Sequence, residues 1–427
     1  MQQQILFNPE ELFKEPLKKY ETLFSLLDLS SLEESLPSTG RKPISRAALT
    51  RALIFKNLRS LPTLSDLVAE LYERPSLSFI LGFQPRIKTI PVERFSSFLR
   101  DTDNLLFQKV RESLVKMLMQ LKIIKGKYLS LDACPIKANV KQNNLKTSIK
   151  NRFCKENQPK HDPDCRLGVF ATFPSGEKKV EFFWGYRNHI INDAQSELPL
   201  VEITLPANVR GTSVVLPHFA LIKEELALKP KAVLGDSEYD SAAVIEYIVK
   251  ELKAKPRIAR NPRGGTSPTL KFSSSGIPIC IAGFQMVSRG IYWDKKENRR
   301  RHKFVCPIRG SKRFAQQHPY CPWFHPQFVK GSGCYKNIRV DVDETIRQKI
   351  DYGSENFKKD YNLRTSSERL FSRLLALLMQ EPTVKGLRAT ANLCTIAHIT
   401  VLAVAYLASF VKEPKRIRFV KSFIPNL

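Results

Sequence analysis

The spacing of hydrophobic residues changes along the chain, and this change limits the possible folds more than any other feature of the sequence. Up to about residue 125 apolar residues recur at helical spacing. From about residue 127, short segments rich in β-branched and aromatic residues lie between polar turns. Helical patterns follow these segments, and helix returns after about Ser354. Strands followed by alternating helices and strands are typical of a mixed α/β domain. The sequence therefore predicts a mixed α/β fold behind an all-helical N-terminal domain.

The N-terminal region contains several amphipathic patterns. Helices are predicted at 17–27, 46–58, 64–72 and, as one or two helices, 95–121. Ser45 and Thr63 stand directly before two of these patterns, where N-cap residues are expected. A helical module ahead of a larger domain can bind DNA or serve packing and oligomerisation, and the sequence leaves both interpretations open.

The central region predicts short strands and then a separate insertion. Strands are expected at 128–132, 168–173, 180–191, 200–204 and 232–236, with helices at 218–226 and 242–253. Glycine, serine and proline interrupt residues 251–350, which predicts a β-rich insertion there. The expected domains are a helical N-terminal domain at 1–125, the first part of an α/β core at 126–250, the insertion at 251–350 and a helical C-terminal part of the core at 351–427.

The chain is strongly basic. Its 427 residues include 69 Lys and Arg against 41 Asp and Glu, a formal net charge of +28. Residues 251–350 alone carry 21 basic and 6 acidic residues, so the insertion holds more than half of that excess. A hydrophobic content of 42% excludes a disordered chain. The charge favours a nucleic-acid partner over a membrane surface or a basic surface without a partner.

Residues 393–411 contain no fully charged side chain and therefore need testing as a membrane span. Their alanines, threonines, His398 and Ser409 favour a buried helix instead, so no membrane partner is expected. The start of the chain lacks the pattern of a signal peptide. The eight cysteines show no regular disulfide framework. We therefore expect a cytoplasmic protein with free thiols.

Three acidic residues have a context that suits catalysis. Asp132 lies at or near the end of an apolar strand, and Asp236 directly follows another. Glu368 shares one stripe of a predicted helix with Tyr361 and Arg364. Three carboxylates could hold two Mg²⁺ ions, which would clamp the attacking and leaving oxygens of a phosphodiester in an in-line displacement. The three residues are thus candidate metal ligands and catalytic residues.

Other interpretations of these carboxylates stay open. A single aspartate is more often a cap or turn residue, and an Arg–Glu pair at i,i+4 is common on a solvated helix. Asp240 is the main rival of Asp236, because the strand end is uncertain by about a turn. Glu355 and Glu344 are the rivals of Glu368.

Five motifs of this chain resemble motifs of the DDE transposases of bacterial insertion sequences and follow the order that they have in that family. The resemblance is to the branch with a Tyr-x2-Arg-x3-Glu signature. The motifs are TLSDLVAELYERPSLSFILGF with IPVERFSSFLRDT in the N-terminal region, LSLDACPIKANV, FFWGYRNHIINDAQSELPL, VLGDSEYDS and YNLRTSSE. Together they span most of the chain. The last motif fits the signature without gaps at Tyr361, Arg364 and Glu368.

The resemblance implies a ribonuclease H-like catalytic domain with Asp132, Asp236 and Glu368 as its metal-binding triad, and a β-rich insertion before the Glu. The implied reaction is hydrolysis at the ends of a mobile element, with Mg²⁺ or Mn²⁺, followed by strand transfer into target DNA; in related enzymes the excised end can pass through a hairpin. The implied partners are terminal and target DNA of the nucleoid and a second subunit assembled on paired ends.

Several further residues are expected at the DNA. Tyr361 and Arg364 would contact the terminal phosphate or a displaced base, and Arg187 belongs to the strand motif that resembles the family. His189, in the same motif, would be structural or touch DNA rather than bind metal. Trp293 could stack on a flipped base, although a place in the core of the insertion is the simpler expectation.

The chain departs from the family at one position, which puts a contact to the DNA backbone in doubt. The fuller signature has a Lys seven residues after the Glu, where this chain has Leu375. Arg369 and Arg373 are nearby, but Arg373 lies far around the helix from the signature stripe and cannot simply replace the Lys.

The cysteines and histidines of the insertion raise the question of zinc. The candidate ligands are Cys306, His318, Cys321, His325 and Cys334, with Cys154 and Cys165 as a distant pair. No Cys-x2-Cys pair occurs, which argues against a structural zinc ion. The alternative to an active transposase is a catalytically inactive descendant, or a zinc-stabilised module, that only binds DNA.

Overall fold

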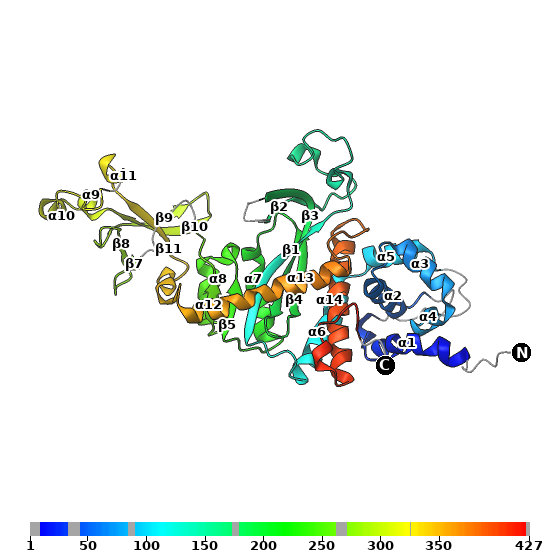
Figure 1. Cartoon of the computed structure of the whole chain (residues 1–427). Helices are drawn as coiled ribbons and strands as arrows, with labels where there is room; N and C mark the ends of the chain where they lie inside the picture. The colour runs from blue at the N-terminus through cyan, green and yellow to red at the C-terminus, as the bar shows by residue number, and fades with distance from the viewer. Residues whose placement is uncertain are drawn as a thin grey trace, which may run out of the picture. The chain divides into compact units, whose positions relative to one another are not determined.

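The structure is a computed structural model that describes residues 9–32, 43–83, 90–172, 179–261, 271–324 and 326–423. The chain divides into two compact units. Unit 1 comprises Met1–Leu228 and Leu363–Leu427, and unit 2 comprises Lys229–Asn362. Both units mix helices and strands, so the prediction of a mixed α/β protein is confirmed (Figure 1).

Unit 1 begins with six helices. They are α1 (Pro9–Ser25), α2 (Arg46–Arg59), α3 (Leu64–Glu73), α4 (Pro75–Ile80), α5 (Val92–Asp101) and α6 (Asn104–Gln120), with a short η1 turn at Ser30–Leu32. Ser45 caps α2 by accepting the amide of Ala48, and Thr63 forms a capping box with Asp66 at the start of α3. The predicted helices and both predicted N-caps are therefore confirmed.

An antiparallel sheet follows, built around one long strand. The strands are β1 (Tyr128–Lys137), β2 (Arg166–Thr172), β3 (Lys179–Asp193) and β4 (Leu198–Pro206), with turns η2 (Lys141–Asn143) and η3 (Lys155–Asn157) before β2. The same stretch of β3 pairs with both β1 and β4, so these two strands lie on opposite edges of it. A Cβ atom at Gly185 would collide with the backbone at Ile136, so only glycine fits where β3 passes β1. Helix α7 (Gly211–Glu224) packs against β3 and β4.

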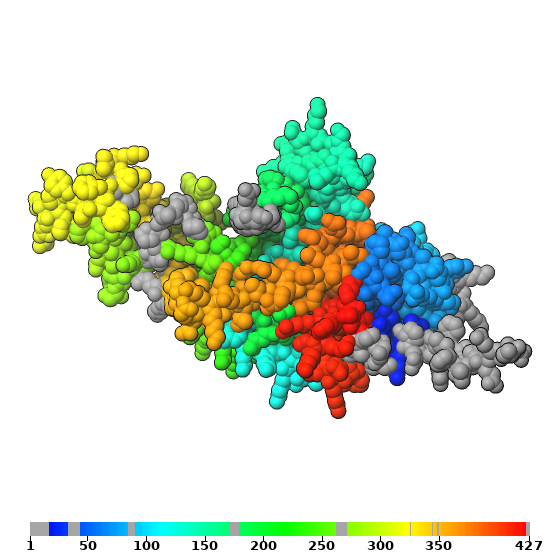
Figure 2. All heavy atoms as spheres, in the orientation of Figure 1, coloured from blue at the N-terminus to red at the C-terminus, as the bar shows by residue number. Residues whose placement is uncertain are grey.

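The C-terminal segment of the chain completes unit 1. It contains η7 (Asn362–Arg364, which begins at the unit boundary), α13 (Thr365–Ala376), α14 (Leu387–Phe410) and η8 (Pro414–Arg416). Helix α14 contacts α2, α5, α6 and β4, and in the space-filling view the C-terminal residues lie against the N-terminal helices (Figure 2). The two ends of the chain therefore share one core.

Helix α14 is long and apolar enough to span a membrane: its most apolar 18-residue stretch has a mean hydropathy of 1.9. However, 78% of that stretch is buried inside the protein. Its polar residues also find internal partners: Thr395 donates to Glu202 at 2.7 Å, and Asn392 donates to the carbonyl of Leu99 at 2.8 Å. The prediction of a buried helix is confirmed.

Unit 2 contains a parallel pair of strands and the insertion. Strands β5 (Ala232–Gly235) and β6 (Lys255–Ile258) are joined through η5 (Ser237–Tyr239) and α8 (Ala242–Lys250). Helix α12 (Glu355–Tyr361) packs on both strands. The buried Arg257 of β6 pairs with Asp351 and, at 3.0 Å, with Asp360 of α12, which fastens this helix to the strands.

The insertion consists of small sheets and short helices. Its elements are β7 (Lys271–Phe272), β8 (Pro278–Ile279), β9 (Val287–Asp294), β10 (Arg299–Val305), α9 (Pro307–Gly310), α10 (Lys312–Gln317), α11 (Pro326–Val329), β11 (Tyr335–Arg339) and η6 (Glu344–Lys349). Strands β9, β10 and β11 form an antiparallel sheet, and β7 pairs with β8. Strands are present as predicted, but the three short helices were not expected from the sequence.

Candidate active site

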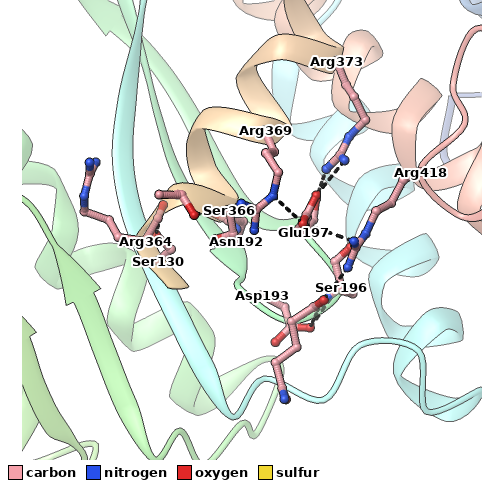
Figure 3. Close-up of polar contacts among 12 residues, drawn as sticks. Ser130, Asn192, Asp193, Ser196, Glu197, Arg364, Ser366, Arg369, Arg373 and Arg418 are labelled. Atoms are coloured by element: carbon pink, nitrogen blue, oxygen red, sulfur yellow. Dashed lines mark hydrogen bonds and ion pairs between the residues drawn. The ribbon is translucent and has the colours of Figure 1, made fainter. Parts of the chain in front are cut away.

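Buried polar side chains fix helix α13 on the sheet of unit 1. The hydroxyl of Ser367 donates to Oδ1 of Asn192 at 2.7 Å, and its oxygen also lies within hydrogen-bonding distance of the Ser130 hydroxyl, at 2.8 Å. Ser366 accepts a hydrogen bond from Nδ2 of Asn192 at 3.0 Å. All four residues are buried, and they come from β1, β3 and α13 (Figure 3). These bonds set the position of α13, and with it the side chains that follow the two serines.

Arg364 lies between two of the predicted catalytic carboxylates. Its Nη2 atom donates to Oε1 of Glu368 at 2.7 Å, and its Nη1 atom lies 3.6 Å from Oδ2 of Asp132. Asp132 and Arg364 are half-buried, whereas the Glu368 side chain is 56% exposed. Oδ1 of Asp132 also accepts the backbone amide of Ala133 at 2.8 Å. Unit 1 thus brings Asp132 and Glu368, which are distant in sequence, to one shared cation.

The Tyr-x2-Arg-x3-Glu segment does not form the single continuous helix that the sequence predicted. Helix α12 ends at Tyr361, the η7 turn covers 362–364, and α13 begins at Thr365. Tyr361 stacks on Phe357 of its own helix with ring centroids 5.9 Å apart. The expectation of one continuous helical stripe through Tyr361, Arg364 and Glu368 is therefore wrong, because a 3-10 turn tightens the helix between the first and last of them.

A second charged cluster lies beside this site and was missed by the sequence analysis. The buried Glu197, in the turn between β3 and β4, accepts hydrogen bonds from Arg369 at 2.6 Å and Arg373 at 2.9 Å. Arg418 lies 3.2 Å from the same carboxylate (Figure 3). Burial alone would raise the pKa of Glu197, but the bonds from Arg373 and Arg369 and the charge of Arg418 outweigh it, so the pKa lies below its usual value.

This cluster accounts for the basic residues near the missing signature lysine. Arg373 is held by Glu197 through both its side chain and a bond to the backbone carbonyl. It therefore fastens α13 to the turn before β4 instead of replacing a lysine at position 375. Leu375 itself is exposed on the same helix.

Unit 2 carries the other predicted carboxylate. Asp236 directly follows β5, as the sequence predicted, and its Oδ1 accepts the amide of Glu238 at 2.9 Å, which caps the η5 turn. Its rival Asp240 is buried, pairs with Arg347 at 2.6 Å and accepts the amide of Asn261 at 2.9 Å. Asp240 thus has a structural role inside unit 2, which leaves Asp236 as the better candidate at this strand end.

The remaining carboxylates are placed as follows. Glu355 is exposed in the first turn of α12 and pairs with Lys358 at 2.9 Å. Glu344 begins the η6 turn. Asp132 lies in the middle of β1 and not at its end, because the strand continues to Lys137. The expectation that Asp132 ends its strand is therefore wrong, although its side chain is accessible as expected.

The predicted DNA-contacting residues differ in exposure. Arg187 of β3 donates to the carbonyl of Val169 at 2.7 Å. His189 is 2% exposed, which suits a structural role and leaves its contact with DNA a prediction. Trp293 of β9 is 54% exposed beside Arg300 of β10, so the expectation that it belongs to the core of the insertion is wrong.

The donor set of the site suits a hard cation. Asp132 and Glu368 offer only carboxylate oxygens, the ligands that Mg²⁺ prefers, and already share the positive charge of Arg364. Within the described residues, no group of three or more metal-ligating side chains converges on one point. Two carboxylates of unit 1 therefore fit a divalent ion, and a complete metal site is not yet assembled.

Comparison with known proteins gives one match to a family. Residues 7–101, which include α1 to α5, match a family described as a transposase domain (DUF772). No curated protein matches the chain. Among solved structures, the chain is similar to a piggyBac transposase in a synaptic complex with hairpin DNA, with 13% identity over 95% of this chain and 79% of that chain. The TM-score between the two structures is 0.37. The helical N-terminal region of this chain is thus similar to a transposase domain.

Proposed function

We propose that this protein is a DDE transposase of a bacterial insertion sequence, which cuts DNA at the ends of its element and joins them to target DNA. The observation that carries the proposal is the meeting of Asp132 and Glu368 at Arg364. The similarity of residues 7–101 to a transposase domain supports it independently. The chain's signature residues and its N-terminal domain thus point to the same activity.

The proposed site is a triad of Asp132, Asp236 and Glu368 on a ribonuclease H-like fold. Asp132 and Glu368 would hold Mg²⁺, or Mn²⁺ in its place, with Asp236 as the third proposed ligand. A bound ion of this kind polarises a phosphate oxygen and lowers the pKa of water. Arg364 would release the carboxylates to the cation and turn its guanidinium to the DNA phosphate, a ligand that suits its planar fork.

The proposed partner is double-stranded DNA. The insertion supplies a basic sheet: its central strand β10 begins with three consecutive arginines, and exposed Trp293 lies on the neighbouring strand β9. Phosphate contacts from such a surface would hold DNA without reading its sequence. We also propose that two subunits act on paired ends, in the cytoplasm at the nucleoid.

The test is a cleavage assay with the full chain, Mg²⁺ or Mn²⁺, and DNA from both sides of the gene. Wild type should cut at fixed positions outside the reading frame. Asp132→Asn, Asp236→Asn and Glu368→Gln should each lower the rate by roughly 100- to 1,000-fold, because several kcal/mol of transition-state stabilisation is lost. All three variants should still bind the DNA in a gel-shift assay, since other residues contact the phosphates.

The matched control is Glu246→Gln, which removes a carboxylate that pairs with Lys250 on the surface of α8. This variant should cut like wild type. Equal cutting by wild type and the three triad variants would refute the assignment of the site. DNA binding without cutting by wild type, under any divalent metal, would favour the inactive DNA-binding descendant instead.

A further inference from the structure

All four cysteines of unit 2 meet in one small pocket of the insertion. They are Cys280, Cys306, Cys321 and Cys334. Each comes from a different place: the turn after β8, the start of α9, the loop after α10 and the residue before β11. The rest of the pocket is lined mainly by apolar side chains such as Ile308, Phe284 and Trp323. Four separate segments of the insertion therefore each contribute one cysteine to the lining of this pocket.

The contacts among these residues are close. Cys334 packs against Cys306 and Cys321 in one small core and, together with Cys280, against a second one. The backbone amide of Cys306 donates to the carbonyl of Cys334 at 2.7 Å. Gly333, at a φ of +71°, is required here because a Cβ atom would lie 2.7 Å from Cβ of Cys306. The backbone is thus shaped to let the thiols approach one another.

Two of the cysteines also begin tight turns. The carbonyl of Cys280 accepts the amide of Gly283 at 2.9 Å, and the carbonyl of Cys321 accepts the amide of Phe324 at 3.0 Å. Such turns direct backbone N–H groups toward the side chain at their start, where they can stabilise a thiolate.

The hydrophobic cores around the pocket are small. One consists of Phe272, Met286, Phe304 and Ile338, with Ile277, Cys280 and Cys334 packed against it. The other is centred on Cys306, Ile308 and Cys321, again with Cys334 beside it. Small domains with such limited cores commonly depend on a metal ion or on disulfides. Cys334 belongs to the surroundings of both cores, so a link through it would join them.

We propose that Cys280, Cys306, Cys321 and Cys334 bind one structural zinc ion that holds the insertion together. Four thiolates in a tetrahedral shell are a usual structural zinc site, and binding releases the thiol protons to solvent. Within the described residues the thiols do not form a ready metal-binding group, so the proposal includes an inward movement of the four side chains on metal binding.

The site differs from the ligands that the sequence suggested. Cys280 lies far upstream of the other three, so local spacing did not reveal it. The ring of His318 lies against Phe284 and Phe314, at centroid distances of 4.9 and 4.6 Å, which gives it a packing role. His325 lies outside the described residues. The missing Cys-x2-Cys pair counted against zinc in the sequence analysis. That criterion does not apply to the proposed site, because its four cysteines come from four separate segments.

The test measures zinc in the purified full chain by mass spectrometry after mild chelation and, in parallel, after refilling with zinc. Wild type should hold about one zinc per chain. Cys280→Ser, Cys321→Ser and Cys334→Ser should each lose most of it. Cobalt-loaded wild type should show thiolate-to-cobalt absorption that these variants lack. The matched control is Cys154→Ser in unit 1, which should retain full zinc content.

Counting free thiols in denaturant without reductant distinguishes zinc binding from a disulfide and from simple packing of the four cysteines. Loss of two of the eight thiols in metal-free wild type would mean a disulfide and would overturn the proposal. Eight free thiols with no zinc before or after refilling would reduce the cluster to core packing and overturn it as well. Metal content is measured without DNA, so this result is separate from the outcome of the cleavage assay.

Discussion

The two units hold their functional side chains in different ways. In unit 1, Arg364 and Glu368 stand on a helix that is fastened by buried serines, Asn192 and the cluster at Glu197. In the insertion of unit 2, basic and aromatic side chains belong to β9, whose residues are largely exposed, and to β10, whose residues are mostly half-buried, beside two small cores. One arrangement fixes a few atoms in place, and the other displays a surface.

This difference matches two kinds of task. A catalytic carboxylate must be held within a fraction of an ångström of its position, which buried and mutually satisfied hydrogen bonds can achieve. A surface that grips a phosphate backbone needs charge and accessible rings, and it tolerates imprecise placement. We expect mutations to have large effects on stability in the first region and effects mainly on DNA affinity in the second.

The largest effect is expected from Glu197→Ala in unit 1. The substitution leaves Arg369, Arg373 and Arg418 without their shared carboxylate, in a site where Glu197 is only 4% exposed. Removing one partner of a buried ion pair costs about 3–5 kcal/mol, and because Arg369 and Arg418 are about half exposed the cost here should lie at the lower end of that range. The free energy of unfolding, measured by denaturant titration, should fall by that amount. Glu246→Ala, which breaks the exposed pair with Lys250, should cost no more than about 1 kcal/mol.

The pH dependence of stability offers a check on the same cluster. Because the pKa of Glu197 is lowered in the folded protein, its contribution is present above the ordinary glutamate value of about 4.3. It is lost as the pH falls through the lowered folded value. Wild type should therefore lose stability below about pH 4.3 more steeply than Glu197→Gln does. Equal slopes would mean that the three arginines do not hold Glu197 ionised.

A smaller effect is expected from Ser367→Ala. The change removes the hydrogen bond to Oδ1 of Asn192 and the hydrogen-bonding contact with the Ser130 hydroxyl, a loss of about 1–3 kcal/mol. It should also lower the cleavage rate of the protein that remains folded, because α13 loses its attachment to the sheet. Ser372→Ala, on the exposed side of the same helix, is the matched control and should change neither quantity. A loss of stability with normal cleavage would show that the anchor does not position Glu368.

Much of unit 1 could be predicted from the sequence because its signals are local. Ser45 and Thr63 cap helices through bonds within three residues, and helical spacing located the N-terminal helices. In unit 2 a local signal succeeded too, because Asp236 follows its strand as expected. Arg364 and Glu368 pair at i,i+4, the arrangement that the sequence already suggested.

The rest depends on contacts between distant segments. Nothing in the sequence around Glu197 distinguishes it from a surface residue, because its partners lie far downstream on α13 and near the C-terminus. Ser366 and Ser367 belong to a recognised motif, yet their bond to Asn192 of β3 depends on how the helix docks on the sheet. Cys306, Cys321 and Cys334 were already candidate ligands, but Cys280 was missed for the same reason, since it reaches their pocket from another segment of the insertion.

The smallest effect is expected on the surface of the insertion, from Trp293→Ala. Its exposed ring is not part of a core, so stability should hardly change. If the ring stacks on a base, DNA affinity should fall by about 1–3 kcal/mol, while the dependence of binding on salt stays the same because no phosphate contact is lost. Trp293→Phe keeps an aromatic face and should recover most of the affinity. A steeper loss of stability than of DNA binding would contradict the division of tasks between the two regions, because it would make Trp293 a structural residue of unit 2.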